Sequence, residues 1–162
     1  MSTIDAPMPA APIIEGPAPH LLVVRAPYYT KIVDGLRDGA ARILTEAGAT
    51  FDVLDVAGAL ELAAAVRLAV SGSPSRTFDG YVALGCVVKG DTDHYEFVCR
   101  EAMAGLTMVV QIHALCLGNG LLTVHDLAQA VARSGPDGHN KGAEAAAAAL
   151  VQINAARWLN GA

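Results

Sequence analysis

The chain has 162 residues, of which 53% are hydrophobic and 17% charged, and its formal net charge is −5. This composition is typical of one globular domain with a sizeable core and argues against a disordered chain. The negative net charge and the absence of a run of Lys and Arg argue against nucleic acid or an anionic membrane as a partner.

The three cysteines indicate the redox state that we expect for the protein. Cys86, Cys99 and Cys116 form no CxxC pair, and each falls within an apolar or helical segment. An odd number of such cysteines is typical of reduced, buried thiols, so we expect a cytoplasmic protein. The N-terminus lacks the basic and apolar regions of a signal peptide, which agrees with this expectation.

The first part of the chain differs in composition from the rest. Residues 1–19 contain five of the eight prolines. Proline cannot donate a hydrogen bond to a strand ladder, so we expect an extended or disordered arm here. We expect residues 20–162 to form a single domain.

Along the rest of the chain, the hydrophobic pattern alternates between that of strands and that of helices. This alternation predicts an α/β domain in which helices cover both faces of a parallel sheet. The expected strands are 21–24, 50–56, 81–88 and 115–124. The expected helices are 30–47, a second that carries Glu61 near its start and runs to about residue 70, 93–113, 126–134 and 140–159. Leu127, Ala130 and Val131 of the fourth helix are expected to point inward.

The stretch 83–95 carries the clearest chemical signal. A strand that leads directly into a helix N-terminus directs backbone N–H groups beyond the sheet edge, which favours an anion such as phosphate. His94 falls in the first helical turn, where an imidazole that titrates near neutral pH can transfer protons. A surface histidine after a helix cap would give the same pattern. The candidate caps are Asp91, Thr92 and an Asp93–Glu96 capping box.

Ligands of parallel sheets bind beyond the C-terminal ends of the strands. The segments at those ends are 25–29, 56–61, 88–94 and 124–126, and the chemically versatile residues fall on these same segments. This convergence predicts a small-molecule site. No HExxH, GxGxxG, GxxxxGK[ST] or GxSxG motif occurs, so we assign no metal, dinucleotide or nucleophile-elbow site.

Each of these residues also has an ordinary structural interpretation. Arg133 is either a surface cation or a phosphate ligand, because a guanidinium binds phosphate through two parallel hydrogen bonds. Tyr28 and Tyr29 either pack at the domain edge or stack on a flat heterocycle. Glu61 either complements its helix dipole or accepts hydrogen bonds from a polyol. Lys141 is expected to be solvated.

Five motifs along the chain carry a family resemblance. They are VAGALEL at 56–62, ALGCVVKGDTDHYEFV at 83–98, LLTV at 121–124, QAVAR at 129–133 and NKGAEAA at 140–146. In this order and spacing, from about residue 21 to residue 150, they resemble the lumazine synthase family.

The resemblance implies a flavodoxin-like three-layer αβα sandwich with a four-stranded parallel sheet. It implies condensation of 5-amino-6-(D-ribitylamino)uracil with 3,4-dihydroxy-2-butanone 4-phosphate, which gives 6,7-dimethyl-8-ribityllumazine, phosphate and water in riboflavin biosynthesis. Lumazine synthases need no cofactor, and their active sites lie between subunits of a homopentamer. The resemblance leaves open whether the assembly is a pentamer or an icosahedral 60-mer.

The resemblance also implies roles for individual residues. His94 matches the histidine that relays protons, and Arg133 matches the arginine that binds the substrate phosphate. Gly90, Asp91 and Thr92 match the helix-start contacts to that phosphate. The residues that match the pyrimidine and ribityl subsite are Tyr28, Tyr29, Ala59, Leu60, Glu61, Val87, Val88, Asn119 and Lys141.

Two other functions stay open on the sequence. A diverged relative would bind flavin or lumazine without useful turnover, and a structural protein would only build the shell. The intact His94 and Arg133 favour the enzyme. The departures from residues common in the family affect the ring-stacking contacts more than the phosphate site, and they are Pro27, Ala57, Ala63 and Asn119.

Overall fold

The computed structural model describes residues 8–72, 77–136 and 139–161, so the first seven residues of the predicted arm lie outside the described residues. The sheet has four parallel strands in the order β2-β1-β3-β4. Its strands are β1 (His20–Ala26), β2 (Thr50–Asp55), β3 (Gly80–Val88) and β4 (Leu117–Val124).

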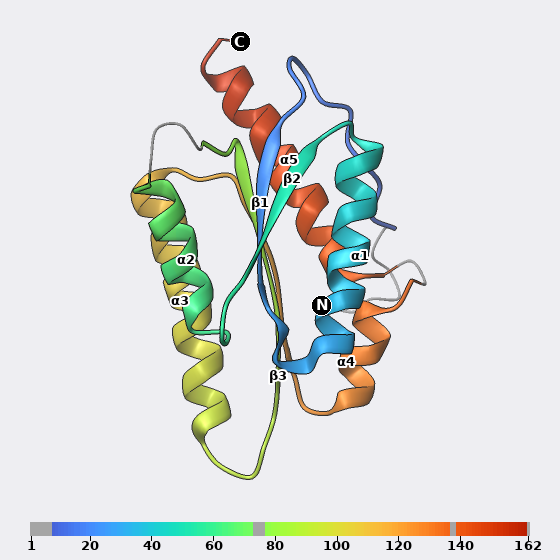
Figure 1. The fold of residues 1–162 in the computed structure, drawn as a ribbon, viewed down its shortest axis with the longest axis vertical. Helices are drawn as coiled ribbons and strands as arrows, with labels where there is room; N and C mark the ends of the chain where they lie inside the picture. The colour runs from blue at the N-terminus through green and yellow to red at the C-terminus, as the bar shows by residue number, and fades with distance from the viewer. Residues whose placement is uncertain (1–7, 73–76, 137–138, 162) are drawn as a thin grey trace.

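Helices cover both faces of this sheet, which confirms the predicted flavodoxin-like, three-layer α/β fold (Figure 1). Helices α2 and α3 lie on one face, and α1, α4 and α5 lie on the other. The short 3-10 helix η1 (Pro27–Tyr29) links β1 to α1. The α-helices are α1 (Thr30–Glu46), α2 (Glu61–Val70), α3 (His94–His113), α4 (Leu127–Ser134) and α5 (Lys141–Leu159).

Strand β1 shows why the predicted strands read as continuous apolar runs. Leu21 and Val23 contribute to the apolar cluster under α1 and α5, whereas Leu22 and Val24 contribute to the cluster under α2 and α3. A strand buried on both faces has no polar side to alternate with. The strand also continues past its predicted end, because Arg25 pairs with both neighbouring strands.

Helix α5 packs unusually close to β4 and to α1. A Cβ atom on Gly118 of β4 would overlap the carbonyl oxygen of Ala145, and one on Gly142 would overlap that of Leu36. Glycine is therefore required at both positions by the approach of another backbone. This packing fixes the start of α5, where Asn140 and Lys141 lie.

Helix α4 does not bury the residues that its sequence pattern predicts. Ala130 is buried, but the side chains of Leu127 and Val131 are 52% and 55% exposed, so the predicted inward orientation of these two residues is wrong. The helix instead approaches α1 through small residues, since Ser134 packs directly against Gly35. Its larger apolar side chains consequently face away from the core of this chain.

The described part of the N-terminal arm is attached to α5. The side chain of Asn154 accepts a hydrogen bond from the Glu15 N–H (3.2 Å) and donates one to the Ile13 carbonyl (2.7 Å). Arg157 donates to the Glu15 carbonyl (2.6 Å). In the part of the chain that the structure describes, no helix combines the length and apolar character needed to cross a bilayer.

Candidate active site

A pocket of about 320 Å³ opens at the C-terminal edge of the sheet. It lies where β1 and β3 end, and these neighbouring strands lead to connections that run in opposite directions along the sheet. Such a switch point is where open α/β sheets bind their ligands. The pocket is lined by Tyr28, Tyr29, Gly58, Ala59, Leu60, Glu61, Cys86, Val87, Val88, His94 and Val98.

Most of these lining residues come from the segments predicted at the strand ends. Three lining residues, Gly58, Cys86 and Val98, were not among the predicted site residues. Gly58 and Cys86 directly precede predicted residues in the chain, and Val98 lies one helical turn after His94. Their proximity to predicted site residues, in the sequence or along α3, was therefore the signal that could have identified them. The predicted site residues that line the pocket are Tyr28, Tyr29, Ala59, Leu60, Glu61, Val87, Val88 and His94.

The two tyrosines form one wall of the pocket. Their ring centroids are 5.1 Å apart and meet edge to face. Tyr29 packs against the apolar core, whereas Tyr28 is 77% exposed. Tyr29 therefore supports Tyr28, whose free face can stack on a flat heterocycle.

The opposite wall is the start of α2. Gly58, Ala59 and Leu60 form the turn before the helix, and the exposed carboxylate of Glu61 occupies its first turn. This placement complements the positive end of the helix dipole. It also leaves the carboxylate oxygens available to accept hydrogen bonds from hydroxyl groups.

Helix α3 begins beside the pocket without a side-chain cap. Asp93 precedes the helix with helical backbone angles (φ −65°, ψ −6°), so the predicted capping box with Glu96 and the alternative side-chain caps are wrong. A capping side chain needs an extended backbone, as Asp126 of α4 has (φ −145°, ψ 166°). The N–H groups of Glu96 and Phe97 bond instead to the Asp93 carbonyl. The positive end of the α3 dipole is thus left uncapped by a side chain, next to His94.

Cys86 lies in the pocket wall and is 5% exposed. Burial raises the pKa of its thiol from the ordinary value of 9.0 to about 11. Because the pKa is raised, the folded protein holds the thiol proton more tightly than the unfolded chain does. The resulting contribution to the free energy of unfolding is complete below the ordinary pKa of 9.0 and is lost as pH rises toward about 11. At neutral pH the residue therefore offers the pocket an uncharged, weakly polar surface.

We expect Cys86 to react with iodoacetamide at pH 8 at least ~10-fold more slowly in the folded protein than in the urea-unfolded chain, because the thiolate is the reactive form. Peptide mapping by mass spectrometry at several reaction times measures both rates. Equal rates in the two states would contradict the burial and protonation described here.

Arg133 does not line this pocket within one chain. It precedes the last residue of α4, on the opposite face of the sheet from α3, and its Nη1 donates to the Gln129 carbonyl (3.0 Å). The structure thus places the predicted proton-transfer group and the predicted phosphate ligand on different sides of the sheet.

Other predicted site residues also lie outside the pocket lining. The Asn119 side chain on β4 accepts a hydrogen bond from the Leu121 N–H (3.0 Å). Lys141 is not simply solvated, because its Nζ pairs with the Glu144 carboxylate at 2.6 Å. The remaining residues are exposed in the loop that leads from β3 to α3, and they are Gly90, Asp91 and Thr92.

The chain is similar to known proteins over most of its length. The family described as 6,7-dimethyl-8-ribityllumazine synthase matches residues 18–157, a range that includes every residue of the pocket as well as Arg133, Asn119 and Lys141. A protein of that name from Agrobacterium fabrum is 43% identical over 145 residues, which are 88% of this chain and 98% of the relative. One from Bartonella tribocorum is 44% identical over 135 residues (83% and 88%), and one from Paramagnetospirillum magneticum is 41% identical over 143 residues (86% and 95%).

Proposed function

Because the chain belongs to the 6,7-dimethyl-8-ribityllumazine synthase family, we propose that the pocket at the ends of β1 and β3 is one half of its active site. The protein is an enzyme of riboflavin biosynthesis. It condenses 5-amino-6-(D-ribitylamino)uracil with 3,4-dihydroxy-2-butanone 4-phosphate and releases 6,7-dimethyl-8-ribityllumazine, phosphate and water. This assignment of function rests on the family match over residues 18–157.

The pyrimidine substrate occupies the space between the two pocket walls. Its flat ring stacks on the free face of Tyr28, and its ribityl chain extends toward Ala59, Leu60 and Glu61. Support comes from the exposed Tyr28 ring and from the exposed Glu61 carboxylate, which lines the pocket together with Gly58. The backbone at Val87 and Val88 borders the ring between these walls.

His94 moves the protons of the reaction. The substrate amine attacks the ketone, phosphate leaves, and the ring closes with loss of water. Each of these steps transfers a proton, and an imidazole can accept and donate near neutral pH. His94 is exposed at the mouth of the pocket, where both substrates would meet.

The phosphate lies over the start of α3, near Gly90, Asp91 and Thr92, where the helix has no side-chain cap. However, the described pocket lining contains no lysine or arginine. A phosphate dianion removed from water needs a cationic partner. We infer that Arg133 of a neighbouring copy supplies it, because Arg133 of the same chain comes from the opposite layer.

The outer surface of the chain supports assembly with further copies. A groove between α2 and α3 is lined mainly by apolar atoms, and it includes Met108 and Ile112, which are 60% and 68% exposed. Leu127 and Val131 expose further apolar surface on α4. Contiguous apolar surface of this kind is typical of protein interfaces. We therefore infer a homo-oligomer, a pentamer or an icosahedral 60-mer, in which Asn119 and Lys141 approach the neighbouring pocket. The free thiols of Cys86, Cys99 and Cys116 support the proposal of a cytoplasmic location.

The test mixes the two substrates with the purified protein and follows the fluorescence of the lumazine product. We expect product to form well above the spontaneous rate. His94→Ala should lower the turnover by less than the ~100-fold that general acid–base catalysis usually contributes, because juxtaposition of the substrates supplies much of the effect. A signal equal to the spontaneous reaction would reject the enzyme and favour a binding or shell protein.

A further inference from the structure

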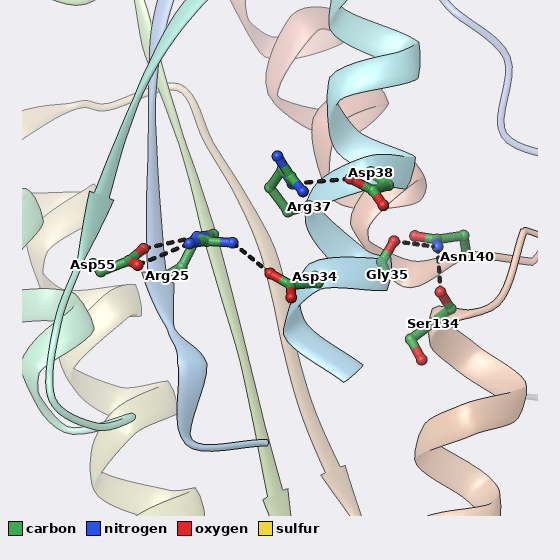
Figure 2. Close-up of polar contacts among 8 residues, drawn as sticks. All are labelled: Arg25, Asp34, Gly35, Arg37, Asp38, Asp55, Ser134 and Asn140. Atoms are coloured by element: carbon green, nitrogen blue, oxygen red, sulfur yellow. Dashed lines mark hydrogen bonds and ion pairs between the residues drawn. The ribbon is translucent and has the colours of Figure 1, made fainter. Parts of the chain in front are cut away.

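The side chain of Arg25 connects three segments near the pocket (Figure 2). Its guanidinium donates two parallel hydrogen bonds to Asp55, from Nε to Oδ1 (2.7 Å) and from Nη2 to Oδ2 (2.8 Å). Its Nη1 donates a third to Asp34 Oδ1 (2.9 Å). The Arg25 side chain is only 14% exposed, so these charge-assisted bonds are partly shielded from water.

The three connected residues flank the two pocket walls in the chain. Arg25 is the next-to-last residue of β1 and lies three positions before Tyr28. Asp34 lies in α1, which continues directly from η1 and its two tyrosines. Asp55 ends β2, and the loop after it leads to Glu61. Arg25 therefore links the helix that follows Tyr28 and Tyr29, which form one pocket wall, to the strand before Gly58–Glu61, which form the other wall.

The end of β2 depends on this link because β2 is an edge strand. Among the described strands it pairs only with β1, and its last register pair is Arg25 with Asp55. Beyond that pair, the Val56 N–H donates to the Arg25 carbonyl (2.8 Å). The backbone and the side chain of one residue thus fix where the loop at 56–60 leaves the sheet.

The position of Arg25 is also unusual for its surroundings. Leu21 and Val23, on the same face of β1, are fully buried apolar residues of the cluster under α1. A third apolar residue at position 25 would continue that pattern, so core packing alone does not explain the arginine. The neighbouring carboxylates do explain it, and their hydrogen bonds raise the pKa of Arg25, so it stays charged.

We propose that Arg25 is a positioning residue that sets the separation of the two pocket walls and thereby the affinity for the ribitylamino-pyrimidine substrate. The proposal rests on the proposed function, because it assigns that substrate to the space between the walls. Arg25 does not line the pocket, so it is placed to act through the walls and not on the substrate itself. Lysine can replace it only in part, since an ammonium cannot hold Asp55 through a planar fork and reach Asp34 as well.

The test compares the steady-state kinetics of Arg25→Met with those of the wild-type oligomer. We expect the KM for the pyrimidine to rise about 10-fold, because a small misplacement of a binding wall is costly. The KM for the phosphate substrate and kcat should stay within about twofold. The pyrimidine KM of Arg25→Lys should fall between those of the wild type and of Arg25→Met. Asp34→Asn and Asp55→Asn should each raise the same KM, but by less than Arg25→Met does.

The matched control is Arg42→Met, which removes another arginine–carboxylate pair, that with Glu46 on α1 (3.1 Å), away from both walls. It should leave all three kinetic constants unchanged. An unchanged pyrimidine KM in Arg25→Met, or an equal loss in every constant, would overturn the proposal. If that variant fails to fold, the two Asp→Asn variants decide by the same criterion. A wild-type protein that makes no lumazine would instead reject the proposed function itself.

Discussion

Arg133→Ala is expected to raise the KM for 3,4-dihydroxy-2-butanone 4-phosphate by about 100-fold, because it removes two charge-assisted hydrogen bonds to the phosphate. The KM for the pyrimidine should change little, since Tyr28 and Glu61 are untouched. Initial rates measured with each substrate varied in turn separate the two constants. Among the described residues of its own chain, the Arg133 side chain donates a hydrogen bond to the Gln129 carbonyl and to no other group, so the substitution should have little effect on folding.

Two variants control for charge and for specificity. Arg133→Lys keeps the charge but not the planar pair of donors, so it should recover only part of the affinity. Arg42→Ala removes the same amount of positive charge as Arg133→Ala does, but from the surface pair with Glu46 on α1, and it should leave both KM values unchanged. An unchanged KM for the phosphate substrate in Arg133→Ala would show that Arg133 is not the phosphate ligand.

Asn140→Ala is expected to lower the free energy of unfolding by about 3 kcal/mol, the sum of a lost helix cap and of buried polar groups left without partners. The Asn140 side chain is 5% exposed. Its Oδ1 caps α5 by accepting from the N–H groups of Gly142 (2.9 Å) and Ala143 (3.1 Å). Its Nδ2 donates to the carbonyls of Gly35 (2.9 Å), Ser134 (2.9 Å) and Gly135 (3.1 Å).

One amide therefore joins α1, α4 and α5, as Figure 2 shows for Gly35 and Ser134. Urea unfolding at one fixed protein concentration measures the loss, because assembly makes stability concentration-dependent. Asn160→Ala is the control, since Asn160 is exposed and its side chain donates to the Ala156 carbonyl (2.8 Å) on its own helix. A loss in Asn140→Ala no greater than that in Asn160→Ala would contradict this role.

The sequence predicted the elements well because local periodicity decides them. The strands were predictable because β1 and β3 are buried on both faces and read as uninterrupted apolar runs. The cap of α3 was mispredicted because capping depends on backbone angles, and Asp93 and Asp126 have the same side chain but different conformations. The exposed Leu127 and Val131 follow a helical pattern that shows one apolar face without showing what covers it.

The candidate site was only partly predictable for a different reason. Tyr28, Glu61 and His94 were predicted together because parallel strand ends meet at one edge of the sheet. The pairing of Arg25 with Asp55 depends on strand register across 30 positions, which periodicity does not report. Arg133 is absent from the pocket of its own chain, and hydrophobic periodicity does not report a contribution from a second copy, which only the family resemblance implied.

Mixed oligomers test the claim that the pocket of one chain and Arg133 of a neighbouring chain form one active site. One chain carries Arg133→Ala and the other carries Ala59→Trp, which fills the pocket, and the two are co-expressed with different tags and purified through both. Random mixing predicts about a quarter of the wild-type activity, because in a closed ring some sites combine an intact pocket with an intact arginine. Activity no higher than that of the two single-variant oligomers would contradict the claim.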